Sequence, residues 1–165
     1  MRLDEFNSAD WADAVEVLRP CVDVQRWCEE VADGRPYASV DELVGAAGDA
    51  AAPFTADEIE AALAHHPRIG ERPSGEGTEA AMSRREQSGV DPADAATAAA
   101  FAEGNRAYEA RFGRVFLIRA AGRSAAEMLE ALEARLGNTP EVEDAVVAEQ
   151  LREIALLRLR GIFTA

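Results

Sequence analysis

The chain of 165 residues has the size of one domain, and 48% of its residues are apolar, which is enough to build a buried core. Its 31 acidic and 17 basic residues give a formal net charge of −14 at pH 7, which makes nucleic acid and anionic membrane surfaces poor partners. No stretch approaches the ~20 apolar residues of a membrane span, and the first residues lack the apolar centre of a signal peptide, so we expect a cytoplasmic protein.

Helix start signals occur throughout the chain. Four tetrapeptides match the capping box, in which a hydroxyl and a carboxylate three residues apart satisfy the free amides of a first helical turn. They are SVDE at 39–42, TADE at 55–58, SRRE at 83–86 and SAAE at 124–127. Two more motifs, DPAD from Asp91 and TPEV from Thr139, place a proline at the first helical position.

These signals predict an all-α bundle of about seven or eight helices in a single domain that covers residues 1–165. The one strand-like run, VFLI from Val115 to Ile118, is too short to form a sheet by itself. The glycine-rich segment from Gly70 to Met82 is predicted to be an irregular loop. The predicted helices lie near 8–19, 21–32, 40–51, 56–65, 93–112, 125–136 and 140–160, with a shorter one near 83–89.

The two cysteines, Cys21 and Cys28, lie seven residues apart in one predicted helix. At a rise of about 1.5 Å per residue, their α-carbons would be ~10 Å apart, which is beyond the reach of a disulfide. We therefore expect both to be small buried hydrophobic residues with free thiols.

The only two histidines, His65 and His66, are adjacent, and helical phase distinguishes them. Counted from Ile59, His66 falls at i+7 on the apolar face, whereas His65 is turned toward solvent. Pro67 disfavours helical backbone at His66, so the helix should end there, with the imidazole at the negative end of the helix dipole. Such a partly buried, chargeable imidazole suits a general acid, or it simply caps the helix. Adjacent histidines lack metal-ligand spacing, so no metal site is expected.

A second polar residue interrupts an apolar stripe near the end of the chain. Val147, Leu151, Ile154, Arg158 and Ile162 follow a 4-3-4-4 spacing, which places a guanidinium in an otherwise apolar row. Burying an arginine without a partner is costly, so Arg158 is expected to meet an anion. That anion is either a carboxylate of the protein or a bound ligand.

Asn105 and Glu86 each have a structural and a functional interpretation. Asn105 shares a stripe with aromatic residues, and its amide is expected to bond a neighbouring backbone group. Glu86 is the fourth residue of SRRE and is expected to complete a capping box with Ser83. The alternative for Glu86 is that it joins His66 and Arg158 in a set that holds a small anionic substrate and gives it a proton.

Four motifs in sequence order resemble those of the 2-oxo-4-hydroxy-4-carboxy-5-ureidoimidazoline (OHCU) decarboxylases of urate breakdown. They are HPRIGE at 66–71, SRREQSG at 83–89, N-x-x-Y-x-x-R-F-G at 105–113 running into VFLIRAAGRS, and EIALLRLRGI at 153–162. The resemblance extends upstream to WCEEVADGRPY at 27–37 and so covers nearly the whole chain. It implies an all-helical enzyme that is free of cofactors and usually a homodimer, and that acts on the unstable intermediate between 5-hydroxyisourate and allantoin.

The resemblance also implies site residues. The catalytic residues of the family fall on His66, Glu86 and Arg158. The chain departs from the family at Ala121. Family members often have a basic residue at this position, whereas here the basic residues are Arg119 and Arg123 on either side of it. Substrate contacts are implied for Pro67, Ser83, Arg84, Arg85 and Gln87 and for the backbone of Phe116, Leu117, Ile118, Arg119 and Ala120.

The chemistry of this substrate explains the residue types. Its carboxylate is on a carbon next to a C=N bond, so electrons released with CO2 flow into the ring and no metal, pyridoxal or thiamine is required. The enzyme must hold the flat ring and deliver a proton to one face of the ureido-bearing carbon, which yields (S)-allantoin as one enantiomer. We expect His66 to be the acid, Glu86 to orient the hydroxyl or ureido group, and Arg158 to bind a polar or anionic edge. The competing hypothesis is a non-catalytic helical interaction module in which His66 and Arg158 are paired for structural reasons.

Overall fold

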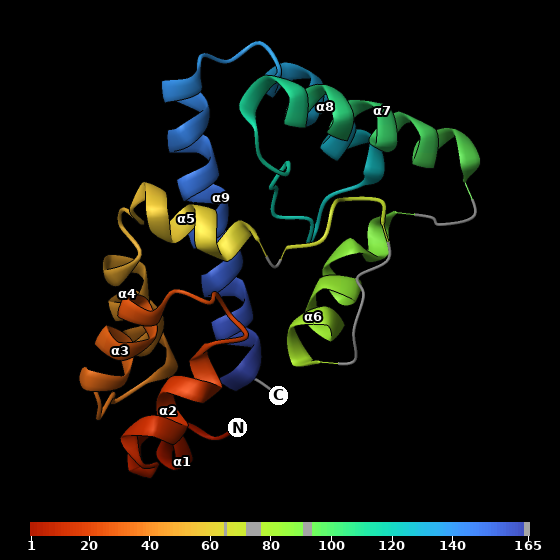
Figure 1. Ribbon diagram of the computed structural model, residues 1–165. Coiled ribbons are helices and arrows are strands. Elements are labelled where there is room, and N and C mark those ends of the chain that lie inside the picture. Colours follow the sequence, from red (N-terminus) through yellow and green to blue (C-terminus); the bar gives the residue numbers. More distant parts are fainter. Residues whose placement is uncertain (65, 72–76, 91–93, 164–165) are drawn as a thin grey trace. The chain divides into compact units, whose positions relative to one another are not determined.

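The computed structural model describes residues 1–64, 66–71, 77–90 and 94–163 (Figure 1). Within these ranges every regular element is helical and no residue is in a strand, so the predicted all-α fold is confirmed. The elements are α1 (Leu3–Ser8), α2 (Trp11–Leu18), α3 (Gln25–Asp33), α4 (Val40–Ala50), α5 (Ala56–Leu63), α6 (Thr78–Glu86), the 3-10 turn η1 (Gln87–Gly89), α7 (Ala95–Phe112), α8 (Ala125–Arg135) and α9 (Pro140–Phe163).

The chain forms two compact units. Unit 1 consists of Met1–Ala62 with Leu151–Ala165, and unit 2 consists of Leu63–Gln150. The helix α9 begins in unit 2 and ends in unit 1. The expectation of a single domain stays a prediction.

Capping residues explain where several helices begin. Glu58 N donates to Thr55 Oγ1 (3.2 Å) and Thr55 N donates to Glu58 Oε2 (2.8 Å), which is a complete capping box at α5. Ser124 and Glu127 form the same reciprocal pair at α8, with distances of 3.2 and 2.7 Å. Pro140 is the first residue of α9, where its missing N–H costs nothing. These three predicted helix starts are confirmed.

One predicted helix start is wrong. SRRE does not cap a helix, because α6 begins at Thr78 after Gly77 and places Ser83 inside the helix, where it is buried. Residues 78–82 are compatible with a helix and form the first part of α6. This part of the segment that was predicted to be an irregular loop is therefore helical. The predicted start at Asp91 lies outside the described residues. The helix α7 begins at Ala95, with Asp94 as its N-cap.

The N-terminal part of the chain also differs from the prediction. The short helix α1 was not predicted, and α3 begins at Gln25, so Cys21 precedes the helix rather than sharing it with Cys28. Both cysteines are nevertheless buried and neither forms a disulfide, as expected. Burial raises the pKa of the Cys28 thiol to about 12, which keeps it protonated and unreactive at neutral pH.

The core of unit 1 is built around Trp27. This side chain is fully buried, and its Nε1 donates to the Ala47 carbonyl of α4 (2.8 Å). The second tryptophan, Trp11, is 47% exposed, and its Nε1 donates to Asp33 (2.7 Å). No helix among the described residues is long and apolar enough to cross a membrane.

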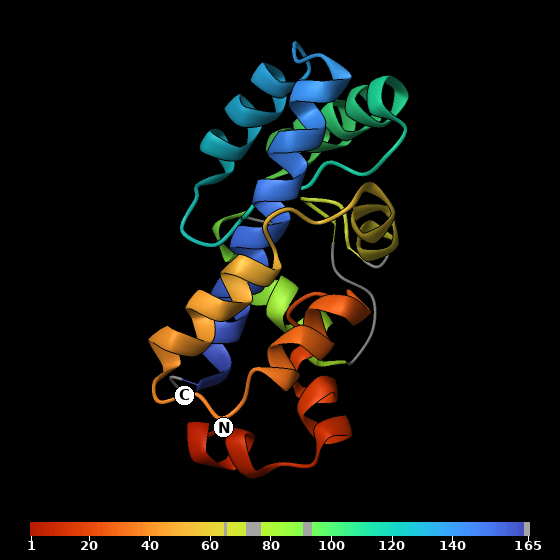
Figure 2. The same ribbon diagram turned by 90° about the vertical axis from the view of Figure 1, so that its left-hand side faces the viewer.

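The helix α4 packs antiparallel to the C-terminal part of α9 within unit 1 (Figure 2). Arg152 Nε donates to the Gly48 carbonyl (3.1 Å), and near the other end Arg160 Nη1 donates to Asp41 (2.8 Å). A side chain at Gly48 would meet the Arg152 guanidinium at 3.0 Å, so the glycine permits the close approach of the two helices.

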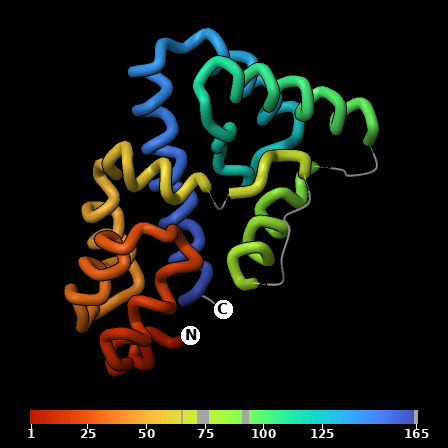
Figure 3. The backbone as a smooth tube through the Cα atoms, in the orientation of Figure 1, coloured from red at the N-terminus to blue at the C-terminus, as the bar shows by residue number. Residues whose placement is uncertain are grey.

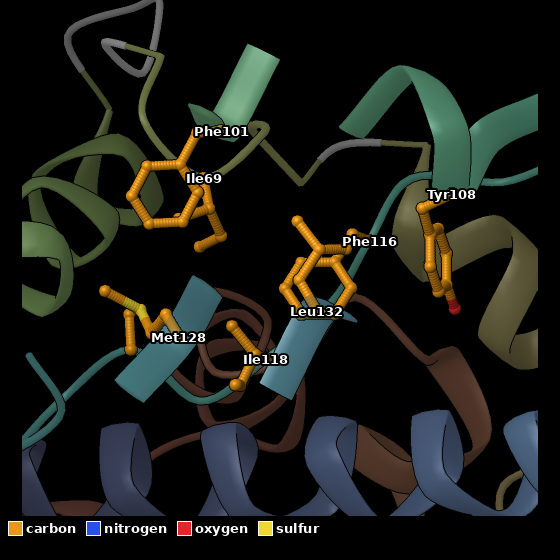
Figure 4. Close-up of a cluster of buried hydrophobic side chains, with 8 residues drawn as sticks. Ile69, Phe101, Tyr108, Phe116, Ile118, Met128 and Leu132 are labelled. Carbon is orange, nitrogen blue, oxygen red and sulfur yellow. The ribbon is translucent and has the colours of Figure 1, made fainter. Parts of the chain in front are cut away.

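The core of unit 2 combines α7 and α8 with two segments that are not helical. Figure 4 shows the side chains of this cluster directed toward one another. The motif around His66 contributes Ile69, and the non-helical run after α7 contributes Phe116 and Ile118. The core therefore holds two of the sequence motifs in place. Its buried members are Ile69, Phe101, Tyr108, Phe116, Ile118, Ala120, Met128 and Leu132.

Candidate active site

His66 lies beyond the end of α5. The helix ends at Leu63, and His66 N donates to the Leu63 carbonyl (3.1 Å) in a last turn that does not continue. Pro67 accounts for this end because it disfavours helical backbone in the preceding residue. The helical phase used to orient His66 therefore does not apply at this position, although His66 is partly buried as expected. His65 lies outside the described residues, so the expected difference in orientation between His65 and His66 stays a prediction.

The segment that carries His66 is held by α7. The carbonyl of Ile69 accepts a hydrogen bond from Asn105 Nδ2 (3.0 Å), and both residues are buried. The interpretation of Asn105 as an amide that bonds a backbone group is confirmed. Arg68 of the same segment pairs with Glu109 of α7 at 2.9 Å. Main-chain and side-chain contacts thus fix the residues that follow His66.

Gly70 joins the His66 segment to the segment that carries Glu86. Its N–H donates to Gln87 Oε1 (3.1 Å), and Gln87 is the residue after Glu86. Gly70 has a φ of +87°, and an added Cβ would lie 3.1 Å from Phe101 Cβ. The glycine is needed for both the left-handed backbone and the close approach to α7.

The second motif forms the end of α6 and the turn η1. Ser83 is buried, Glu86 and Gln87 are partly buried, and Arg84 and Arg85 are exposed. The two arginines occupy the last turn of α6, where positive charge is favourable for the helix dipole. Pro67, in the first motif, is also partly buried.

The third motif is the non-helical segment 116–120 between α7 and α8, which the tube in Figure 3 follows. Phe116, Leu117, Ile118 and Ala120 are buried, and Arg119 is partly buried.

Two contacts tie the neighbouring parts of unit 2 to this segment. The Arg119 N–H donates to Gln150 Oε1 of α9 (2.9 Å). A Cβ on Gly89 would lie 2.6 Å from the carbonyl oxygen of Arg123, so the backbone of η1 rests against the residues that follow the segment. The motifs around His66, Glu86 and 116–120 are therefore linked in unit 2.

A buried ion pair supports the same segment. Arg135 of α8 bonds Glu143 of α9, and its Nη1 donates to the Leu117 carbonyl (2.7 Å). Tyr108 Oη donates to Glu143 (2.6 Å). Burial alone would raise the pKa of Glu143, but hydrogen bonds led by those of Arg135 and Tyr108 hold it below its ordinary value. Burial and the bond to Glu143 raise the pKa of Tyr108 to about 12.

Sequence reasoning did not single out Arg135 or Glu143, although the signal was present. Arg135 follows Met128 and Leu132 at a 4-3 spacing on the buried face of α8. Glu143 extends the apolar stripe of α9 back by four residues from Val147. The phase argument applied to Arg158 would have found both residues.

Arg158 is buried on the apolar stripe of α9, as predicted. It is 5% exposed, and its Nη1 donates to the Pro20 carbonyl (3.2 Å). It belongs to unit 1, whereas His66 and Glu86 belong to unit 2. Its expected anionic partner stays a prediction. Within the described residues, no group of three or more His, Cys, Asp or Glu side chains could hold a metal ion.

Comparisons with known proteins agree with the order of the motifs. The family model described as OHCU decarboxylase matches residues 7–160. The 2-oxo-4-hydroxy-4-carboxy-5-ureidoimidazoline decarboxylase of Amia calva is 32% identical over 168 residues, which cover 98% of this chain and 94% of that protein. The uric acid degradation bifunctional protein TTL of Arabidopsis thaliana is 38% identical over 107 residues, and the match spans 62% of this chain and 33% of that protein.

A solved structure extends the likeness to three dimensions. The crystal structure of an OHCU decarboxylase in the presence of (S)-allantoin superposes with a TM-score of 0.75 and 28% sequence identity, covering 91% of this chain and 99% of that one. Together with the match of the family model over residues 7–160, this likeness shows that the chain belongs to the OHCU decarboxylase family of carboxy-lyases.

Proposed function

We propose that this chain decarboxylates OHCU to (S)-allantoin in urate degradation. Family membership supports the reaction, and the similar structure obtained in the presence of (S)-allantoin supports the product. The hydrogen bond from Gly70 N to Gln87 Oε1 carries the assignment within this chain, because it ties the segment of His66 to the segment of Glu86. An acid and a carboxylate on linked segments are what the reaction requires.

The proposed reaction breaks the bond between the substrate ring and its carboxylate. The electron pair of that bond forms a C=C bond to the ureido-bearing carbon, and the nitrogen of the former C=N bond takes up a proton. His66 then delivers a proton to one face of the ureido-bearing carbon, while the hydroxyl loses its proton toward Glu86 and becomes a carbonyl. The face of delivery sets the enantiomer. The substrate itself accepts the electrons, so the proposal includes no metal and no organic cofactor.

Arg158 is proposed to bind a polar or anionic edge of the substrate. The guanidinium is buried, and charge acts more strongly at low dielectric than in water. A local positive centre is also needed to attract an anion to a chain with a net charge of −14. Arg84 is exposed and Arg119 is partly buried, and both lie in the motif segments where they would add to this attraction.

The backbone of 116–120 is proposed to contact the substrate ring, together with Pro67 and the stretch 83–87. Buried backbone outside a helix offers fixed donors and acceptors that match a flat ring rich in hydrogen-bonding groups. The proposed assembly is a homodimer, as the family resemblance implies. Light scattering during size-exclusion chromatography would then give a molar mass of twice the 17.7 kDa of the chain.

The proposed activity is tested by making the substrate in place. Urate oxidase and hydroxyisourate hydrolase convert urate to the intermediate, this protein is added, and circular dichroism follows the optical activity of allantoin. We expect the chiral signal to rise faster and higher than in the buffer control, where spontaneous decay gives a racemate. A signal no faster than in the control would contradict the proposal and favour the non-catalytic interaction module.

A further inference from the structure

The segment 116–120 is largely buried and is not helical, and the described residues include no strand that could pair with it. A buried backbone carbonyl or amide without a partner costs about 1–3 kcal/mol. Two side chains from helices meet this need. Arg135 Nη1 donates to the Leu117 carbonyl (2.7 Å), and Gln150 Oε1 accepts from the Arg119 N–H (2.9 Å).

The geometry of Arg135 is fixed on every side. Its Nε donates to Glu143 Oε1 (2.8 Å), and its guanidinium lies 4.5 Å from the ring centre of Phe116, within the range of a cation–π contact. Only 9% of the Arg135 side chain is exposed, so its position is fixed with Nη1 directed at the Leu117 carbonyl.

Glu143 is fixed in turn. Its Oε1 accepts from Tyr108 Oη (2.6 Å) as well as from Arg135, and its Oε2 accepts from Asn138 Nδ2 (2.9 Å). Arg135 is the last residue of α8, and Glu143 is in the first turn of α9, so both charges also suit the helix dipoles.

Stability alone does not explain this arrangement. Replacing a buried ion pair with apolar residues of similar volume is often neutral or stabilising, because two charges no longer have to be removed from water. An apolar pair, however, offers no donor to the Leu117 carbonyl. The function specific to the pair is therefore to hold the backbone of the segment.

We propose that Arg135 and Gln150 are positioning residues that set the backbone of 116–120 against the substrate, with Glu143 holding Arg135 in place. The proposal rests on the proposed function, in which this backbone contacts the substrate ring. Both residues act through the segment and touch no reacting atom. Their loss should therefore affect how well and in which orientation the substrate binds.

The test uses the double variant Arg135→Met/Glu143→Leu and the single variant Gln150→Leu. We expect the double variant to remain folded, with a melting temperature within about 5 °C of wild type or above it. KM should rise ~10–100-fold in both variants, because small misplacements of binding groups are costly. The enantiomeric excess of allantoin should fall when enzyme is in sufficient excess that spontaneous decay is minor. Hydrogen exchange of a peptide covering 114–123 should become faster.

The matched control is Arg106→Met/Glu103→Leu. It removes an ion pair between two exposed side chains of α7, and we expect KM and enantiomeric excess close to wild type. Unchanged KM and enantiomeric excess in Gln150→Leu and in a folded Arg135→Met/Glu143→Leu would overturn the proposal. If the double variant fails to fold, Gln150→Leu decides the question, because it removes no charge. Inactive wild type would instead contradict the proposed function.

Discussion

Replacing Gly70 with alanine tests how tightly the His66 segment is fixed. Gly70 has a φ of +87°, a left-handed conformation that costs a residue with a Cβ about 1–2 kcal/mol. The new Cβ would also lie 3.1 Å from Phe101 Cβ, and overpacking of this kind adds about 1–3 kcal/mol. We therefore expect Gly70→Ala to lower the free energy of unfolding by about 2–5 kcal/mol.

Two other glycines separate these contributions. Gly113 has a φ of +71° with no neighbouring atom within 4 Å of an added Cβ, so Gly113→Ala should cost only the conformational term of about 1–2 kcal/mol. Gly45 is inside α4 and also has no atom within 4 Å, so Gly45→Ala should stabilise the protein by up to about 1 kcal/mol. The order of stability is therefore Gly45→Ala, wild type, Gly113→Ala and then Gly70→Ala.

Urea unfolding followed by far-UV circular dichroism measures these differences, and the coupled allantoin assay measures activity. Gly70→Ala should also lower kcat/KM by ~10-fold, because a shifted Gly70 weakens the bond to Gln87 that links the two motif segments. Gly113→Ala should leave kcat/KM close to wild type. Equal losses of stability in Gly70→Ala and Gly113→Ala would refute the reasoning from the Phe101 contact, and an unaltered kcat/KM in Gly70→Ala would refute the role of the link.

Further predictions concern the proton donor, metals and acid stability. His66→Ala should abolish turnover while His65→Ala stays close to wild type, and equal losses in two folded variants would contradict the assignment of His66. Dialysis against a chelator should leave the rate of allantoin formation unchanged, whereas a metal-dependent lyase would lose activity. The pKa of Glu143 in the folded protein is below its ordinary value of 4.5, so its contribution to stability is complete above that pH and is lost as the pH falls through the lower folded pKa. The unfolding free energy of wild type should therefore decline on acidification relative to that of Arg135→Met/Glu143→Leu, as urea titrations on both sides of pH 4.5 would show.

Local chemistry explains which helix boundaries could be predicted from the sequence. The capping box of Thr55 and Glu58 and the proline at position 140 act within a single turn, so four residues of sequence contain the whole signal. The same four-residue pattern at Ser83 predicted a start that is wrong, because the helix already begins at Thr78. A capping motif does not report whether the residues ahead of it are helical as well.

The site shows the same division between local and tertiary information. The period of α9 correctly predicted that Arg158 is buried. The phase of α5 could not be extended to His66, because the helix ends at Leu63. Helical phase could have indicated that Arg135 and Glu143 are buried. Their pairing with each other and the bond to Leu117 depend on contacts between separate helices, which no local pattern encodes.

Both tryptophans of the chain, Trp11 and Trp27, belong to unit 1, and this gives the two units separate optical signals. Tryptophan fluorescence during unfolding follows unit 1 alone, whereas far-UV circular dichroism follows the helices of both units. Coincident fluorescence and dichroism transitions would indicate that the chain unfolds as one cooperative domain. Separate transitions would indicate that unit 2, which carries His66 and Glu86, can open while unit 1 stays folded.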